Sequence, residues 1–348
     1  VSVCILEKER IPSYHSTGRS FAFYIESYGN NIVRKLTSSS KDFFLKHSQS
    51  TVSPLLKPRG LLHIATKKQD KFLNQMYDEL IKTNKRLNLL NSNEILKIVP
   101  CLNSQYVFSA IQDQDASDID VNGLYNIYFK KFNKNKGSLF TDIKIDKFIK
   151  NNNNWSISTN QGNFFCELII NAAGAWCDEV GAMVNAQKIG LMPKKRTVFC
   201  FKPNNLSLEN NWPLVVDIEE NFYFKVENET VLASPADETD CLPHDAYPDE
   251  IDLALGAERI KKATNFKFNN INNKWAGLRN FVNDKTPVIG FDSKIENFFW
   301  LAGQGGYGIQ VAPALAKIAS NIILNKSNDY YENKYNIDIN LLDVKRLL

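Results

Sequence analysis

The sequence predicts an α/β fold in which an antiparallel β-sheet domain is inserted into a second, discontinuous domain. Its 348 residues, 43% of them apolar, can supply two domains with continuous cores. In the middle of the chain, four β-rich runs follow one another like hairpin strands and precede an expected helix from Pro248 to about Ala263. The runs are Thr197–Phe201, Leu214–Ile218, Asn221–Val226 and Thr230–Ser234. This block predicts an antiparallel sheet covered by a helix.

The second domain is predicted from a strand, a glycine-rich turn and a helix near the end of the chain. Phe298–Ala302 is an apolar run of strand length, residues 303–308 are rich in glycine, and Val311–Leu324 is mostly apolar over a helical length. At the other end, Val1–Leu6 is expected to be a buried strand. A polar loop, Glu7–Tyr28, then enters an expected helix at Asn31–Thr37.

The remaining elements are short. They are a helix after a capping-box pattern at Thr66–Gln69 that contains Phe72 to Ile81, helices at Ser92–Ile98 and Val121–Phe132, and strands at Leu139–Thr141, Trp155–Ser158 and Phe164–Ile170. The polar end of the chain, Lys326–Leu348, is expected to be peripheral.

Composition argues against several classes of function. Lys and Arg exceed Asp and Glu by only 4 and form no basic stripe, which disfavours a nucleic-acid-binding protein. The 6 cysteines lack a C-x-x-C pair and metal-ligand spacing with the 4 histidines, so buried reduced thiols are expected instead of a zinc site or disulfides. No apolar run is long enough to span a bilayer. We expect a cytoplasmic protein, with peripheral attachment at the inner membrane as the alternative.

The glycine-rich turn matches a nucleotide-binding pattern without its usual context. Gly303-Gln304-Gly305-Gly306-Tyr307-Gly308 fits G-x-G-x-x-G between a strand and a helix. A dinucleotide-binding turn, however, opens a β-α-β unit with an acidic residue about 20 positions on, and here the chain becomes polar and ends. Successive glycines still allow backbone to pass close to a flat ligand, and the helix N-terminus favours negative charge there. A ligand-binding turn and a tight structural turn fit the pattern equally well.

Three other segments have the character of a nucleotide site. Glu7 ends the first expected strand, where dinucleotide folds place a carboxylate against the adenosine ribose. Residues Ser16 to Ser20 carry hydroxyls and the Arg19 guanidinium, which suit a pyrophosphate. Leu168–Trp176 passes from an apolar strand into small residues, as expected where backbone lies against a nucleotide. Each segment alone is also compatible with an ordinary loop or buried strand.

Four motifs occur in one order over nearly the whole chain: HSTGRS at residues 15–20, NAAGAWCD at 171–178, KWAGLR at 274–279 and FFWLAGQGGYGIQ at 298–310. Together they resemble the FAD-dependent oxidoreductases that oxidise amino acids, the family of D-amino acid oxidase, glycine oxidase and sarcosine oxidase. Within this family the chain is most similar to bacterial D-arginine dehydrogenase. The resemblance implies a Rossmann-like FAD-binding domain with an inserted antiparallel substrate domain.

The resemblance also implies a set of site residues. Expected FAD contacts are Glu7 and Lys8 at the adenosine ribose, His15, Ser16, Thr17, Gly18, Arg19 and Ser20 around pyrophosphate and flavin, Lys144 at the adenine, Ala173 and Gly174 in the small-residue turn, and Gly305, Gly306, Tyr307, Gly308, Ile309 and Gln310 along the flavin. Arg279 resembles the arginine that binds the substrate carboxylate, assisted by Tyr28 and Tyr223. Arg196 resembles a further substrate-contacting arginine.

The chain departs from its arginine-oxidising relative at two positions. Phe23 replaces a histidine, and Gly60 stands where an acidic residue would neutralise a cationic side chain. Because a buried guanidinium without an anionic partner is costly, a neutral or aromatic D-amino acid is the expected substrate. The family's first strand and its own glycine loop are expected before Val1 and are not in this sequence. The chain as given is therefore expected to bind FAD poorly or not at all.

These inferences predict the following organisation. Residues 1–45, 121–190 and 275–330 form the FAD-binding domain, residues 46–120 and 191–274 the substrate-binding domain, and residues 331–348 a C-terminal tail. The expected reaction is hydride transfer from an amino acid to FAD, giving a 2-oxo acid and ammonia, with a quinone or oxygen as electron acceptor. The alternatives are oxidation of a secondary amine or a 2-hydroxy acid, or a catalytically silent flavoprotein that acts as a binding protein.

Overall fold

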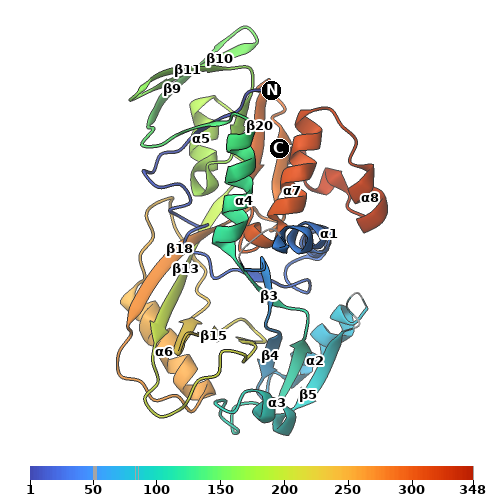
Figure 1. Cartoon of the computed structure of the whole chain (residues 1–348), viewed down its shortest axis with the longest axis vertical. Helices are drawn as coiled ribbons and strands as arrows, with labels where there is room; N and C mark the ends of the chain where they lie inside the picture. Colours follow the sequence, from blue (N-terminus) through green and yellow to red (C-terminus); the bar gives the residue numbers. More distant parts are fainter. Residues whose placement is uncertain (50–52, 83, 85, 348) are drawn as a thin grey trace.

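The structure, a computed structural model, describes residues 1–49, 53–82, 84 and 86–347. Two groups of helices and strands occupy the upper and lower halves of the molecule, joined through a narrower middle (Figure 1). The chain passes between the halves several times, so each half is built from segments that are distant in sequence (Figure 1).

The lower half is built on a 9-stranded sheet. Its strands in spatial order are β17 (Thr239–Asp240), β13 (Met192–Phe201), β16 (Thr230–Ser234), β15 (Tyr223–Glu227), β14 (Leu214–Asp217), β4 (Leu61–Ala65), β6 (Ser109–Asp113) and β5 (Leu87–Asn91), with β18 (Asn273–Phe281) also paired to β13. All pairs are antiparallel except β4 with β14, which are parallel. The predicted antiparallel sheet is thus correct except where two strands far apart in sequence meet without a hairpin.

The two faces of this sheet have different covers. One face packs a large apolar cluster under α6 (Glu250–Ala263) and α3 (Ser92–Ile98), with Phe199, Phe224 and Val215 among its buried residues. Helix α2 (Asp70–Leu80) covers part of the opposite face through Leu73 and Leu80. The rest of that opposite face turns toward the upper half, and we call it the inner face of the sheet.

The upper half contains smaller sheets and most of the helices. A 3-stranded sheet of β12 (Ile169–Asn171), β20 (Phe298–Ala302) and β19 (Val288–Phe291) lies beside α7 (Gly308–Ile323), α1 (Asn31–Ser48), α5 (Cys177–Met183) and α8 (Asp329–Tyr335). The other elements are β1 (Cys4–Leu6) with β8 (Ser138–Phe140), the meander β9 (Ile145–Asn151), β10 (Asn154–Thr159) and β11 (Gly162–Cys166), helix α4 (Val121–Lys134), and the small sheet of β2 (Phe23–Tyr24), β7 (Ser117–Ile119) and β3 (Leu56–Pro58).

Local signals explain several boundaries. The Asp120 side chain caps α4 by accepting from Gly123 N at 2.8 Å, as the sequence predicts. Helix α3 has its predicted bounds, with a reciprocal Asn91–Glu94 capping box that the sequence reading missed. At α2, Gln69 reaches back to Thr66 N at 3.0 Å, but the helix begins only at Asp70. The division into domains at the expected boundaries stays a prediction.

Four expectations are wrong. Strand β1 is exposed instead of buried, with Ile5 44% accessible, because it pairs only with β8 in the described chain. The run predicted at 164–170 is two strands, since β11 pairs with β10 whereas β12 pairs with β20. The end of the chain is not peripheral, because its few apolar residues, among them Leu342 and Val344, are fully buried. Of the cysteines, only Cys101, Cys177 and Cys200 are buried, and all six are free thiols.

Candidate functional site

Arg279 is a partly buried guanidinium that forms no ion pair within the described chain. It lies on β18, and its Nη1 donates a hydrogen bond of 3.3 Å to Tyr28 Oη, the single bond of its side chain to a described residue. Burial acts to lower the pKa of Arg279, but Tyr28, Tyr223, Glu220 and Glu238 outweigh it and hold the pKa above its ordinary value. The arginine therefore stays charged and retains donors for an anionic ligand.

Two tyrosine hydroxyls beside Arg279 have unused hydrogen-bonding capacity. Tyr28 Oη accepts from Arg279, so its own hydrogen remains free to donate. Burial raises the pKa of Tyr28, although Arg279 acts in the opposite direction, and the hydroxyl stays protonated. Tyr223 Oη is buried and has no hydrogen-bond partner among the described residues. A buried hydroxyl without a partner is uncommon and indicates a ligand or water at that point.

Arg279, Arg196 and Tyr223 share the inner face of the large sheet. In the β13–β18 register Arg279 pairs with Lys194 and Arg196 with Gly277, so both arginines point to the same side. The Arg196 guanidinium lies 5.9 Å from the centre of the Tyr223 ring. Unlike Arg279, Arg196 is compensated, because its Nη2 donates to Glu238 Oε1 at 2.8 Å. Arg279 is thus the better candidate for binding a substrate anion.

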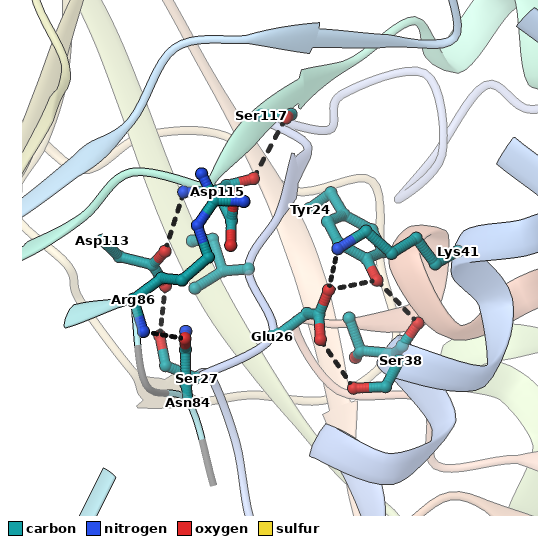
Figure 2. Close-up of polar contacts among 12 residues, drawn as sticks. Tyr24, Glu26, Ser27, Ser38, Lys41, Asn84, Arg86, Asp113, Asp115 and Ser117 are labelled. Atoms are coloured by element: carbon teal, nitrogen blue, oxygen red, sulfur yellow. Dashed lines mark hydrogen bonds and ion pairs between the residues drawn. The ribbon is translucent and has the colours of Figure 1, made fainter. Parts of the chain in front are cut away.

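The segment that carries Tyr28 is anchored on both sides (Figure 2). On the helix side, the Glu26 carboxylate accepts hydrogen bonds from Tyr24, Ser38 and Lys41 at 3.1, 2.9 and 2.7 Å. On the sheet side, Ser27 Oγ donates to Asp113 Oδ2 at 3.1 Å. Asp113 is 1% exposed, and burial raises its pKa despite the hydrogen bonds from Asp115 N and Ser27. These contacts fix the position of Tyr28 relative to Arg279.

Phe23 and Gly60, the two departures from the arginine-oxidising relative, lie close to this segment. Phe23 packs with Tyr223 and Val216 in one apolar cluster, and the Lys225 ammonium lies 5.1 Å from its ring centre. Gly60 has a φ of +80°, a conformation that favours glycine, and no side chain reaches the site from it. The wall near Tyr223 is therefore apolar.

The glycine-rich turn lies directly against Arg279. Gly303 and Gly305 have φ angles of +64° and +53°, and Gly305 N donates to Asn280 O at 2.8 Å. A Cβ on Gly306 would come within 2.8 Å of the Arg279 guanidinium, so only glycine leaves this approach undisturbed. Helix α7 begins at Gly308, and no side chain of the described chain caps it. The turn therefore presents backbone N–H groups and a positive helix end beside the arginine.

The other residues of this turn have structural contacts. Tyr307 Oη donates to Lys285 O, and its ring lies 6.2 Å from that of Tyr28. The Gln310 amide accepts from Ile25 N at 3.0 Å and donates to Thr37 Oγ1 at 2.9 Å. Ile309 packs in an apolar cluster with Tyr24 and Phe44. Gln310 therefore ties α7 to the Tyr28 segment, and its side chain is already occupied.

The N-terminal loop is held largely by its own contacts. Glu7 Oε1 accepts from Glu9 N at 2.9 Å, and His15 lies 2.9 Å from Glu9. Ser16 Oγ donates to Leu278 O at 2.7 Å, Thr17 O accepts from Ser20 N, and a Cβ on Gly18 would clash with Ser13 O. Arg19 pairs with Asp245 and donates to two backbone carbonyls. The Arg19 guanidinium, expected at a pyrophosphate, is thus engaged by protein groups.

Several expected cofactor residues from distant segments do meet in the structure. Glu7 O accepts from Ile143 N at 2.9 Å, which brings Glu7 beside the exposed Lys144. The turn at Ala173 and Gly174 leads to Trp176, whose ring is contacted by Lys8 at 5.2 Å and by His15 at 4.8 Å. Gly174 also lies beside Asn280, next to the glycine-rich turn. These groups lie along one side of the loop, apart from the Arg279 clamp.

Sequence reasoning missed the carboxylates of the site. A cavity of about 340 Å³ is lined by Glu220, Asp237, Glu238 and Asp252 together with Arg259 and neighbouring residues. Asp237 accepts from Thr197 N at 2.7 Å, and burial raises its pKa. These residues come from hairpins and loops without a motif, and only the pairing of β13 to β16 brings them beside Arg196.

Comparisons with known proteins agree on the family. The profile of the family described as DAO, FAD dependent oxidoreductase, matches residues 1–322. The chain belongs to this family of FAD-dependent oxidoreductases, and FAD is its cofactor. Among the described residues no helix is long and apolar enough to cross a membrane.

Individual relatives are more distant. The chain is 28% identical over 182 residues to FAD-dependent oxidoreductase domain-containing protein 1 of Xenopus laevis, covering 46% of this chain and 35% of that protein. It is 27% identical over 190 residues to mitochondrial dimethylglycine dehydrogenase of Mus musculus, covering 49% and 22%. The chain thus spans about a third or less of these relatives. Particular similarity to D-arginine dehydrogenase is not among these findings.

Solved structures share the fold. L-proline dehydrogenase from P. horikoshii has a TM-score of 0.80 at 20% identity, covering 95% of this chain and 89% of that one. NikD, an amino acid oxidase of nikkomycin biosynthesis, has a TM-score of 0.81 at 14% identity, covering 98% and 91%. At these identities the similarity establishes the fold, and the chemistry must be argued from the site.

The residues near Arg279 fit a flavin. Asn280 Oδ1 is a buried acceptor without a partner in the described chain, and its residue lies between Gly174 and Gly305. An N–H group of a planar ligand would satisfy it. The uncapped start of α7 and the bare backbone at Gly306 suit the negatively charged edge of such a ligand. Asn280 and residues 305–308 would therefore hold the reactive part of FAD.

Proposed function

We propose that this protein oxidises a neutral amino acid, preferentially a D-amino acid, with FAD as hydride acceptor. The observation that carries the proposal is Arg279, a guanidinium without an anionic partner in the described chain, beside two tyrosine hydroxyls able to donate. A carboxylate accepts from an arginine fork and two hydroxyls better than any other small anionic group of metabolites of this size. The fixed approach of Gly306 to Arg279 brings this clamp to the cofactor side.

The residues would act by binding and orientation. Arg279 would hold the substrate carboxylate through two N–H groups, and Tyr28 and Tyr223 would each donate a hydrogen bond to it. The double anchoring of the Tyr28 segment at Glu26 and Asp113 restricts the clamp to one geometry. Holding the α-carbon in a single orientation favours hydride transfer by positioning alone.

When bound, FAD supplies the acceptor that takes the hydride from the α-carbon. The amine would lose a proton and become an imine, which water hydrolyses to a 2-oxo acid and ammonia. No side chain need act as base if the amine enters neutral. The electrons would then pass to a quinone or to oxygen, and we place the reaction in the cytoplasm.

The preference for a neutral side chain rests on the walls of the site. Phe23 and Val216 pack around Tyr223, and Lys225 adds a positive charge near Phe23. The two carboxylates closest to the clamp differ in availability, since Glu238 is paired with Arg196. A cationic side chain would meet apolar groups and a lysine on the Phe23 side, at a cost in desolvation.

The test is the visible spectrum of the purified chain with added FAD, followed by anaerobic mixing with D- and L-enantiomers of neutral and basic amino acids. We expect the flavin band to bleach with neutral D-amino acids and to change little with D-arginine. Bleaching by D-arginine alone would refute the neutral pocket. No bleaching by any amino acid, with FAD bound, would refute the reaction.

Oxidation of a secondary amine is the second candidate. The similarity to dimethylglycine dehydrogenase over 49% of the chain favours it. The same Arg279 clamp would bind the carboxylate, and only the substituents on nitrogen would differ. N-methylated amino acids added to the same panel separate the two reactions, because a secondary amine oxidase should bleach faster with the N-methyl form than with its parent.

A further inference from the structure

His63 is a buried polar residue on the same sheet face as Tyr223. Along β4, its neighbours Leu62 and Ile64 point into the large apolar cluster, so His63 points to the inner face. The register pairs His63 with Val216 on β14, and Val216 with Tyr223 on β15. His63 and Tyr223 are therefore two strands apart in one row, with backbones separated by about 10 Å.

The imidazole of His63 is unsatisfied. The residue is 9% exposed, and its Nδ1 is buried without a hydrogen-bond partner among the described residues. Burial lowers the pKa of His63 to about 4, although Asp217 acts in the opposite direction, so the ring is neutral near pH 7. A neutral imidazole can donate or accept one hydrogen bond but offers no charge.

The surroundings leave His63 between two apolar clusters. On one side Phe23, Val216 and Tyr223 pack together, and on the other Ile111 packs under α2. His63 is a member of neither cluster. Buried polar atoms are rarely left unpaired, and here two of them, His63 Nδ1 and Tyr223 Oη, lie in the same cross-strand row.

We propose that His63 contacts the distal end of the substrate and selects neutral amino acids whose side chain ends in a hydrogen-bonding group, such as a carboxamide. This inference rests on the proposed function, because it takes the substrate carboxylate to lie at Arg279 and Tyr223. One ligand that spans the row satisfies both orphaned atoms, Tyr223 Oη at its carboxylate and His63 Nδ1 at its far end. An apolar side chain of equal length leaves His63 unpaired.

The test is calorimetric binding of two unreactive carboxylates to the full chain with added FAD. Glutaramate and 5-methylhexanoate have the same shape, but the first ends in a carboxamide and the second in an isopropyl group. We expect glutaramate to bind about tenfold more tightly, the worth of one good hydrogen bond. His63→Leu should abolish this preference, and His63→Asn, which keeps an amide near the place of Nδ1, should retain part of it.

Ile111→Val is the matched control, since Ile111 is the cross-strand neighbour of His63 on the same face. It should leave the preference intact. If His63→Leu does not fold, His63→Gln replaces it, because its longer side chain moves the amide away from the Nδ1 position. A preference that survives the loss of His63, or equal binding of both ligands by the unaltered chain, overturns the inference. A His63-dependent preference in a chain whose flavin no amino acid bleaches keeps this site and refutes the proposed reaction.

Discussion

Replacing Arg279 by lysine tests the carboxylate clamp. Lysine keeps the positive charge but presents a single ammonium, whereas the guanidinium can bind both carboxylate oxygens in one plane. One charge-assisted hydrogen bond is worth about 1.5–3 kcal/mol. At about 1.4 kcal/mol for each tenfold change, Arg279→Lys should raise KM by roughly 10- to 100-fold. Because the ammonium also loosens the orientation of the α-carbon, kcat should fall as well.

The assay is steady-state reduction of an artificial electron-accepting dye with the best amino acid from the bleaching panel. Arg86→Lys is the control, because Arg86 pairs with Asp115 at 2.9 Å on the surface and 68% of its side chain is exposed. This variant should behave like the unaltered protein. A folded Arg279→Lys protein with unchanged KM would show that the substrate carboxylate binds elsewhere.

Four further predictions concern stability and the glycine turn. Folded His63 resists protonation, so stability should fall by about 3 kcal/mol as pH drops from 6.5 to about 4, and His63→Gln should flatten this loss in urea titrations. The raised pKa of Asp113 has the opposite sign: stability conferred by the protonated form is lost as pH rises above 3.8, and Asp113→Asn should gain on the unaltered protein there, a constant difference contradicting this. Gly306→Ala should displace Arg279 and raise KM about tenfold with an unchanged melting temperature; an unchanged KM would refute the contact. Phe44→Ala, at a fully buried position, should cost about 3–5 kcal/mol and Phe44→Leu under about 1.5, and equal losses would contradict tight packing there.

Sequence periodicity was sufficient for elements whose residues carry a local signal. Strand β20 and helix α3 have the predicted bounds, because an unbroken apolar run and a stop before proline are read from neighbours alone. The glycine turn and the family resemblance likewise depended on contiguous motifs. Arg279, Tyr28 and Tyr223 were named from these motifs, and the structure brings all three together.

Strand β18, which carries Arg279, escaped prediction because it lacks apolar alternation. Trp275, Gly277 and Arg279 face the site, so the face that would normally read as solvent-exposed or buried is instead mixed. A strand that lines a ligand site is shaped by the ligand as well as by the core. Its hydrophobic pattern is therefore a poor guide to its structure.

The sequence by itself determined the family, the cofactor and the arginine at the centre of the site, since each depends on motifs in which the informative residues are neighbours. Only the tertiary structure decided which side chains surround that arginine. His63 and Tyr223 are far apart in sequence and become partners of one face only through the parallel pairing of β4 with β14. The loss of the expected Arg196 contact to Glu238 has the same cause. Pairing between distant strands depends on the energy of the whole sheet, which no local pattern encodes.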